Sequence, residues 1–287
     1  MLFYFFFFVF GTIIGSFLNV VVLRYGSHSF FSKRSFCGSC GKKLSWFELI
    51  PLVSFLIQRR RCRGCRSKIS WQYPLVELIT GLVFVSVFWK NTFLSSEIFF
   101  SSYSVIQLLV IGNDLLLWSL LISLSVYDLR HKIIPNALVF GFVSLSFLHL
   151  LVSYSIFHIP YSLSLFGTLL LPAPFALIWL LSKGRAMGLG DAKLMLGFSP
   201  FVGIVGGLSA ILIGFWFGAL VALAMLLLKS VAFFLPRTVA PHLREKLKYL
   251  TMKSELPLAP FLVLGLFIVY LTGIDVTGLG QLLAVSF

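Results

Sequence analysis

Long apolar stretches separated by short polar ones dominate the chain and predict a bundle of membrane-spanning helices. Mostly apolar stretches cover residues 2–23, 74–89, 105–126, 133–151, 161–181 and 257–274. A helix that crosses the hydrocarbon core of a bilayer needs about 20 predominantly apolar residues, and these stretches are close to that length. Six helical spans are therefore expected from these segments.

A further segment, residues 194–228, runs for 35 residues without a charged side chain. At about 1.5 Å per residue, one helix of that length would exceed the bilayer thickness. Gly206 and Gly207 lie near its middle and mark a break. Two short helices are therefore expected here, and the fold class predicted is an all-α polytopic membrane protein with about eight transmembrane helices.

Composition supports the membrane class. Of 287 residues, 59% are hydrophobic and 11% are charged. Soluble domains are typically about 45–50% apolar and about 25% charged. The length of the chain therefore predicts a number of spans and not a number of soluble domains.

The basic residues predict which loops face the cytoplasm. With the N-terminus outside and eight spans, the cytoplasmic segments are residues 24–73, 129–132, 182–193 and 229–256, which hold 22 of the 23 Lys and Arg residues. This matches the positive-inside rule. The C-terminus is then also outside, and the net charge of +14 is explained by topology, so no nucleic-acid partner is expected.

Four cysteines in the basic loop form two CxxC pairs separated by 21 residues: Cys37, Cys40, Cys62 and Cys65. Four thiolates at this kind of spacing are typical of a closed, tetrahedral, structural zinc site. Redox pairs or two disulfides are the alternatives. The loop between the first two spans is therefore predicted to be zinc-ribbon-like.

Two acidic residues, Asp128 and Asp191, lie at the predicted cytoplasmic ends of spans. Carboxylates are costly near lipid and often mark functional sites. Two neighbouring carboxyls share a proton, so the ionised one can activate a water while the protonated one polarises a peptide carbonyl, as in aspartic proteases. The alternative is that each acid caps a helix or pairs with a nearby Lys or Arg.

The second acid follows two glycines in Gly188-Leu189-Gly190-Asp191. Glycine lets a backbone approach a substrate strand closely and can act as a hinge. Asp114 stands inside a span without such a motif, and for it a structural hydrogen bond or a contact with lumenal water is expected instead.

The motifs as a set resemble the type IV prepilin peptidase family over most of the chain. They are, in order, residues 15–21 (GSFLNVV), both CxxC pairs, residues 46–51 (WFELIP), residues 73–78 (YPLVEL), the Tyr127-Asp128 pair, residues 188–194 (GLGDAKL) and residues 256–261 (LPLAPF). Their order and spacing carry the resemblance more than any single motif does.

This resemblance implies a bacterial inner-membrane aspartic protease that cleaves the basic leader of prepilins or pseudopilins at the cytoplasmic face. Cleavage falls between a Gly and a Phe-like residue. Many family members also N-methylate the new terminus with S-adenosylmethionine. The motif match makes Asp128 and Asp191 the catalytic pair and the four cysteines the ligands of Zn²⁺.

The resemblance also divides the chain into a first transmembrane helix (residues 1–23), a cytoplasmic zinc-binding region with a methyltransferase role (24–73) and a transmembrane protease domain (74–287). Gly188, Gly190 and Lys193 are expected to support the catalytic loop. Glu48 and Glu77 are candidates for the methyl-transfer pocket or for binding the substrate amine, with a salt bridge in the basic loop as the alternative.

Three other functions stay open from the sequence. A member that is only a peptidase would lack the methyl-transfer step. A presenilin-like GxGD intramembrane protease shares the YD and GLGD segments, although the CxxC loop favours the prepilin enzyme. A zinc-stabilised membrane scaffold or a transporter with ion-binding acids is the non-enzymatic alternative, but no internal repeat supports a transporter.

Overall fold

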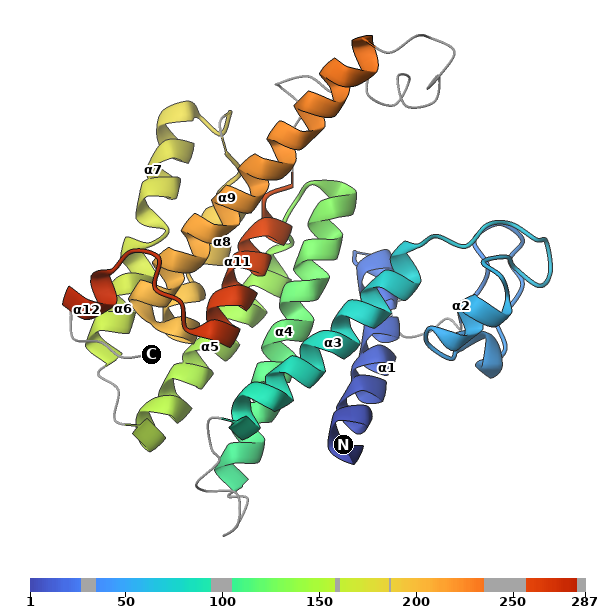
Figure 1. Ribbon diagram of the computed structural model, residues 1–287, viewed down its shortest axis with the longest axis horizontal. Helices are drawn as coiled ribbons and strands as arrows, with labels where there is room; N and C mark the ends of the chain where they lie inside the picture. Colours follow the sequence, from blue (N-terminus) through green and yellow to red (C-terminus); the bar gives the residue numbers. More distant parts are fainter. Residues whose placement is uncertain (27–34, 94–104, 158–160, 186, 235–256, 283–287) are drawn as a thin grey trace. The chain divides into compact units, whose positions relative to one another are not determined.

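The computed structural model describes residues 1–26, 35–93, 105–157, 161–185, 187–234 and 257–282, and these are almost entirely helical (Figure 1). The longer helices are α1 (Leu2–Arg24), α3 (Gln72–Phe93), α4 (Val105–His131), α5 (Asn136–Phe157), α6 (Tyr161–Leu170), α7 (Ala173–Ser182), α9 (Phe198–Phe234) and α11 (Ala259–Thr272). The short ones are η1 (Trp46–Leu49), α2 (Val53–Ile57), α8 (Leu189–Met195) and α12 (Leu279–Leu282). Within these ranges the only β-structure is two isolated bridges, so the all-α class is confirmed.

Five helical segments are long and apolar enough to cross a membrane: Leu2–Arg24, Gln72–Thr92, Gln107–His131, Leu163–Ser182 and Phe198–Ser230. Two shorter apolar helices are Asn136–Val152 and Ala259–Thr272. Among the described residues these make seven segments, one fewer than the expected count, and the difference lies in residues 194–228. The assignment of loops to the two membrane faces stays a prediction from charge.

The break in the long uncharged segment lies at Gly203 and not at Gly206-Gly207. Gly203 has φ 76° and ψ 168°, a backbone conformation that side chains disfavour, and α9 continues beyond it as one helix. Gly207 is helical, and a Cβ there would lie 2.5 Å from Cδ1 of Leu171. This glycine thus serves close packing instead of a break, which the sequence pattern cannot distinguish.

The predicted span 161–181 is interrupted once. Pro172 is the N-cap of α7, and α6 ends at Leu170. Proline has no backbone N–H to continue the helical hydrogen bonds, so it ends one helix and begins the next.

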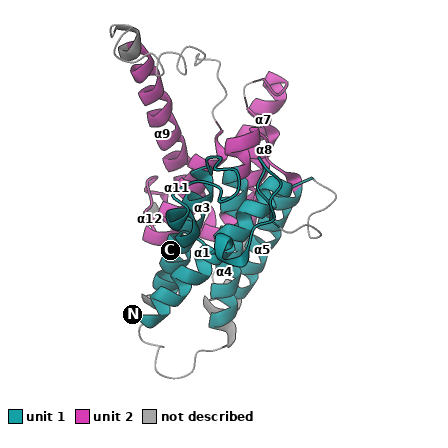
Figure 2. Cartoon of the chain, turned by 90° about the vertical axis from the view of Figure 1, so that its right-hand side faces the viewer, with its two compact units in different colours: residues 1–126, 137–159 teal, residues 127–136, 160–287 magenta. Residues whose placement is uncertain are grey.

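The chain divides into two compact units (Figure 2). The first comprises residues 1–126 and 137–159, and the second comprises residues 127–136 and 160–287. The basic cysteine loop belongs to the first unit. Both Asp128 and Asp191 belong to the second, so the candidate catalytic pair lies within one unit.

In the first unit, α1 and α3 pack antiparallel through small residues. A Cβ on Gly11 would lie 2.8 Å from Cα of Gly81, and a Cβ on Gly15 would lie 2.8 Å from Cα of Glu77. Small residues allow helix backbones to approach in this way in membranes. The close approach brings Glu77 beside the second half of α1, which the charge pattern predicts to lie toward the cytoplasm.

Asp114 also lies in the first unit, buried on α4. Its carboxylate is 2.9 Å from Nδ1 of His149 on α5 and accepts a 3.3 Å hydrogen bond from the Asn91 side chain on α3. These partners bear out the structural role expected for Asp114, because a buried carboxylate needs such partners.

In the second unit, α9 and α11 cross in close contact at two glycines. A Cβ on Gly265 would overlap the carbonyl oxygen of Ala210, and a Cβ on Gly214 would lie 2.9 Å from Cα of Leu262. The helices run antiparallel, since Gly218, one turn after Gly214, faces Phe261. This crossing fixes the start of α11, which contacts the candidate active site.

We expect Gly265→Ala to destabilise the protein, because the new methyl group meets backbone atoms that cannot move aside. Forced overpacking costs about 1–3 kcal/mol, and the measurement is thermal unfolding of the purified protein. Gly112→Ala on α4 is the matched control, because a Cβ there has no neighbour within 4 Å. Equal unfolding temperatures for the two variants would contradict the close crossing.

Candidate active site

Asp128 lies in the last turn of α4 and is 4% exposed. Its Oδ2 accepts a 3.2 Å hydrogen bond from the backbone N–H of Ala259, the first residue of α11. The first N–H groups of a helix have no partner within that helix and carry partial positive charge. Burial disfavours the ionised form of Asp128, and this hydrogen bond at the start of α11 offsets part of that cost.

The chain turns sharply just after Asp128. Lys132 donates its backbone N–H to the Asp128 carbonyl oxygen (2.8 Å) and has a positive φ of 55°. The imidazole of His131 lies 4.2 Å from the Tyr127 ring, between centroids. This turn ends α4 and leads through Pro135 to α5.

Asp191 lies in the first turn of the short helix α8, whose N-cap is Gly188. Burial, and secondly the charge of Asp128, raises the pKa of Asp191 to about 7. An electrostatic effect of this kind requires the two carboxyls to be neighbours. The two predicted acids thus lie in the same unit, where the charge of Asp128 reaches Asp191.

The two glycines before Asp191 have different surroundings. A Cβ on Gly190 would lie 2.9 Å from Cβ of Ile134, so this position requires close approach to the segment between α4 and α5. A Cβ on Gly188 would meet Asp191 Oδ2 at 3.6 Å, an ordinary contact. The lack of a side chain at Gly190 therefore permits close contact with another segment of the protein, whereas the sequence had suggested contact with a substrate strand. This contact places α8 against the segment that follows Asp128.

Lys193 connects the same two segments. Its Nζ donates a 3.1 Å hydrogen bond to Oδ1 of Asn136, the first residue of α5. The Asp191 helix is thus held to the Asp128 segment by a glycine contact and by a side-chain hydrogen bond.

The four cysteines gather at one point of the first unit, with all their Sγ atoms within 4.8 Å of one another. Tetrahedral zinc with Zn–S bonds of about 2.3 Å separates its sulfurs by about 3.8 Å, and the Sγ atoms of Cys37 and Cys65 are 3.9 Å apart. That separation is too long for a disulfide bond. The donor set and its size fit a structural metal ion.

Each CxxC pair forms the same small loop. Phe36 bridges to Lys43 in the first pair, and Arg61 bridges to Lys68 in the second. Hydrogen bonds from the backbone N–H groups of Ser39 and Cys40 lower the pKa of Cys37 to about 6. Such donors stabilise a thiolate, which is the form that binds metal.

Glu48 is held within this cysteine region. Its Oε1 is 3.0 Å from Nζ of Lys42, and its Oε2 accepts the Ser45 N–H at 2.9 Å. The Ser45 N–H, and next the Lys42 side chain, lower the pKa of Glu48. The salt bridge considered from the sequence is present.

Glu77 is buried at the α1–α3 contact and accepts the backbone N–H of Leu52 at 2.8 Å. Leu52 has φ 60° and ψ −50°, an unfavourable conformation for a residue with a side chain. Glu77 therefore holds a strained turn between η1 and α2. No contact between Glu48 and Glu77 is recorded in the described part of this unit.

Two family models match the chain: the bacterial peptidase A24 N-terminal domain over residues 9–91 and the type IV leader peptidase family over residues 115–223. A prepilin leader peptidase/N-methyltransferase of Klebsiella pneumoniae is 30% identical over 69% of this chain and 84% of its own length. The chain belongs to the type IV leader peptidase family.

Other relatives with the same name support this membership. The Myxococcus xanthus protein is 35% identical over 79% of this chain, although the match spans only 64% of that relative. The Bacillus subtilis protein is 29% identical over 93% of both chains. No solved structure matches the chain significantly.

The roles of two groups in this family member were not predicted from the sequence. The Ala259 N–H lies in the residue 256–261 motif, where prolines at a helix start are a recognisable signal. Asn19 is 1% exposed and donates to the carbonyl oxygens of Gly15 and Tyr73. Asn19 belongs to the residue 15–21 motif, and an amide among apolar residues in a span is a second sequence signal, but neither specified these partners.

Proposed function

We propose that this type IV leader peptidase is a membrane aspartic protease that removes the basic leader from prepilins or pseudopilins at the cytoplasmic face of the bacterial inner membrane. The observation that carries the proposal is that Asp128 and Asp191 lie in one compact unit, where the charge of Asp128 helps to raise the pKa of Asp191. The family model over residues 115–223 and the names of the relatives supply the substrate class.

The different surroundings of the two acids support different roles. Asp128 accepts an N–H at the start of α11, which favours its ionised form. Burial, and secondly the charge of Asp128, raises the pKa of Asp191 to about 7, so Asp191 keeps its proton below that pH. Asp128 then acts as general base toward the attacking water, and Asp191 donates a hydrogen bond to the scissile carbonyl oxygen.

We expect cleavage to slow as the pH rises through about 7. The pKa of Asp191 lies near 7, so this acid loses its proton above that pH and no longer donates to the carbonyl. The measurement is kcat/KM for a prepilin against pH. An alkaline limb far above this range would contradict the role given to Asp191.

The pH dependence of the free energy of unfolding provides an independent test of the raised pKa of Asp191. A raised pKa means that the folded protein keeps a proton that the unfolded chain has already lost, so stability declines as the pH rises from about 4 to about 7. Asp191→Asn removes this contribution. The difference in unfolding temperature between wild type and this variant should therefore change across that window and be constant above it.

The Ala259→Pro variant tests the role of Asp128 as general base. Proline occurs at the first residue of helices and lacks the N–H that Asp128 accepts. It disfavours the α conformation of the preceding Leu258, so the unfolding temperature of the variant is measured as well. A charge-assisted hydrogen bond contributes about 1.5–3 kcal/mol, so the acidic limb of the rate profile should move to higher pH by about one to two units. Ala259→Gly keeps the N–H and is the control. Coincident acidic limbs in the two variants would show that the Ala259 N–H does not stabilise the ionised form of Asp128.

We also propose that the enzyme N-methylates the new terminus, as the relatives' names indicate, with S-adenosylmethionine as donor. Zinc is proposed as the structural ion of the cysteine site, where it would fix the two CxxC loops together. Glu48 and Glu77 remain candidates for the methyl-transfer region by position. Both carboxylates accept hydrogen bonds from the protein itself, which fits a positioning role better than direct contact with S-adenosylmethionine.

A further inference from the structure

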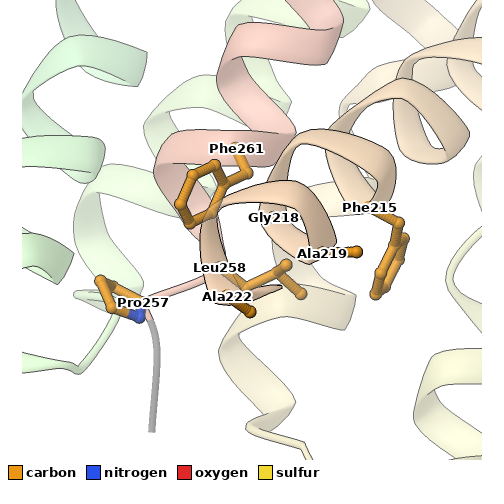
Figure 3. Close-up of a pocket in the computed structure, with 7 residues that line it drawn as sticks. All are labelled: Phe215, Gly218, Ala219, Ala222, Pro257, Leu258 and Phe261. Carbon is orange, nitrogen blue, oxygen red and sulfur yellow. The ribbon is translucent and has the colours of Figure 1, made fainter. Parts of the chain in front are cut away.

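An apolar cavity of about 250 Å³, open on one side, lies between α9 and the start of α11 (Figure 3). Figure 3 shows its lining: Phe215, Gly218, Ala219 and Ala222 from α9, and Pro257, Leu258 and Phe261 from the other side. The lining offers no charged side chain. The cavity therefore suits an apolar group.

The cavity exists because the two helices separate after their close crossing. At Gly214 the backbones touch, and one turn later a Cβ on Gly218 would meet the Phe261 ring at an ordinary 3.5 Å. One further turn along α9, Ala222 presents only a methyl group. Small side chains on α9 thus leave space where α11 begins.

Consecutive residues of the chain belong to the cavity and to the candidate active site. Leu258 lines the cavity, and the next residue, Ala259, donates its N–H to Asp128. A substrate residue adjacent to the bond under attack at Asp128 is therefore within reach of this cavity.

We propose that this cavity is the specificity subsite for a large apolar side chain next to the scissile bond, with Ala222 setting its size. The inference rests on the proposed protease function. A lipid acyl chain is the competing occupant, but it would have no relation to the residue at the cleavage site.

The test is a size swap with the full-length enzyme. Prepilin substrates carry either Phe or Ala at one residue flanking the scissile bond, varied on each side in turn. Ala222→Leu fills the cavity and should lower kcat/KM for the Phe substrate relative to the Ala substrate about tenfold or more on one side of the bond. Ala224→Leu, an exposed position on the same helix, should leave that ratio unchanged.

The Phe/Ala ratio does not depend on how much enzyme is folded, so partial misfolding cannot imitate the effect. Gly218→Ala provides a milder filling of the same space and should shift the ratio in the same direction. An unchanged ratio in an active Ala222→Leu enzyme overturns the subsite and favours a lipid occupant. Complete absence of cleavage by the wild type would overturn the proposed protease function, and the subsite with it.

Discussion

Asp128→Asn and Asp191→Asn are each expected to lower prepilin cleavage about 10³-fold or more, since general acid–base catalysis alone contributes about 10²–10⁴. Asparagine keeps the size and hydrogen-bonding shape of aspartate but cannot take up a proton from water at Asp128. At Asp191, it removes the acid that neighbours Asp128. The measurement is the rate of leader removal in membranes that contain equal amounts of each variant.

Asp275→Asn is the matched control for both substitutions. Asp275 lies in the second unit after α11, where its carboxylate accepts the N–H groups of Thr277, Gly278 and Gly280. It has a local structural role, so its variant should cleave at close to the wild-type rate. Retained cleavage in either the Asp128 or the Asp191 variant would exclude the two-acid mechanism.

Replacement of Cys37 or Cys62 by Ser is expected to remove the bound metal, from about one zinc ion per chain to almost none, because a structural site needs all four thiolates. Metal binding to modules of this kind is coupled to their folding. Elemental analysis of the purified protein measures the metal content. Increased cleavage by trypsin within residues 59–66 would report the loss of structure.

Ser39→Ala is the control for the cysteine variants, because Ser39 lies in the same CxxC loop but contributes only its backbone N–H to Cys37. It should keep the metal. A metal content in Cys37→Ser equal to that of the wild type would contradict the four-cysteine site.

The candidate sites were predictable wherever a residue type is costly in its surroundings. Asp128 and Asp191 are acids in an apolar chain, and the cysteines repeat at metal-ligand spacing. The sequence alone therefore indicated the pair of acids and the group of four cysteines as candidates. The apolar pattern predicted the helices, and the assignment of the loops between them to a membrane face stays a prediction from charge. These signals depend on local chemistry and need no knowledge of packing.

What could not be predicted depends on contacts between distant segments. Gly203 and Gly207 look alike in the sequence, but one breaks a helix and the other packs against Leu171. Likewise, the N–H of Ala259 became part of the active site only when α11 met the end of α4. The cavity near Ala222 arises from the divergence of two helices, which no single segment specifies.

The most direct test of the two-acid protease is the N-terminal mass of a prepilin co-expressed with the wild-type enzyme or with Asp128→Asn. We expect the wild type to yield a pilin without its leader and with one added methyl group, whereas Asp128→Asn leaves the leader in place. A wild-type product without the methyl group would refute only the methyl-transfer proposal. Removal of the leader by Asp128→Asn would contradict the central claim.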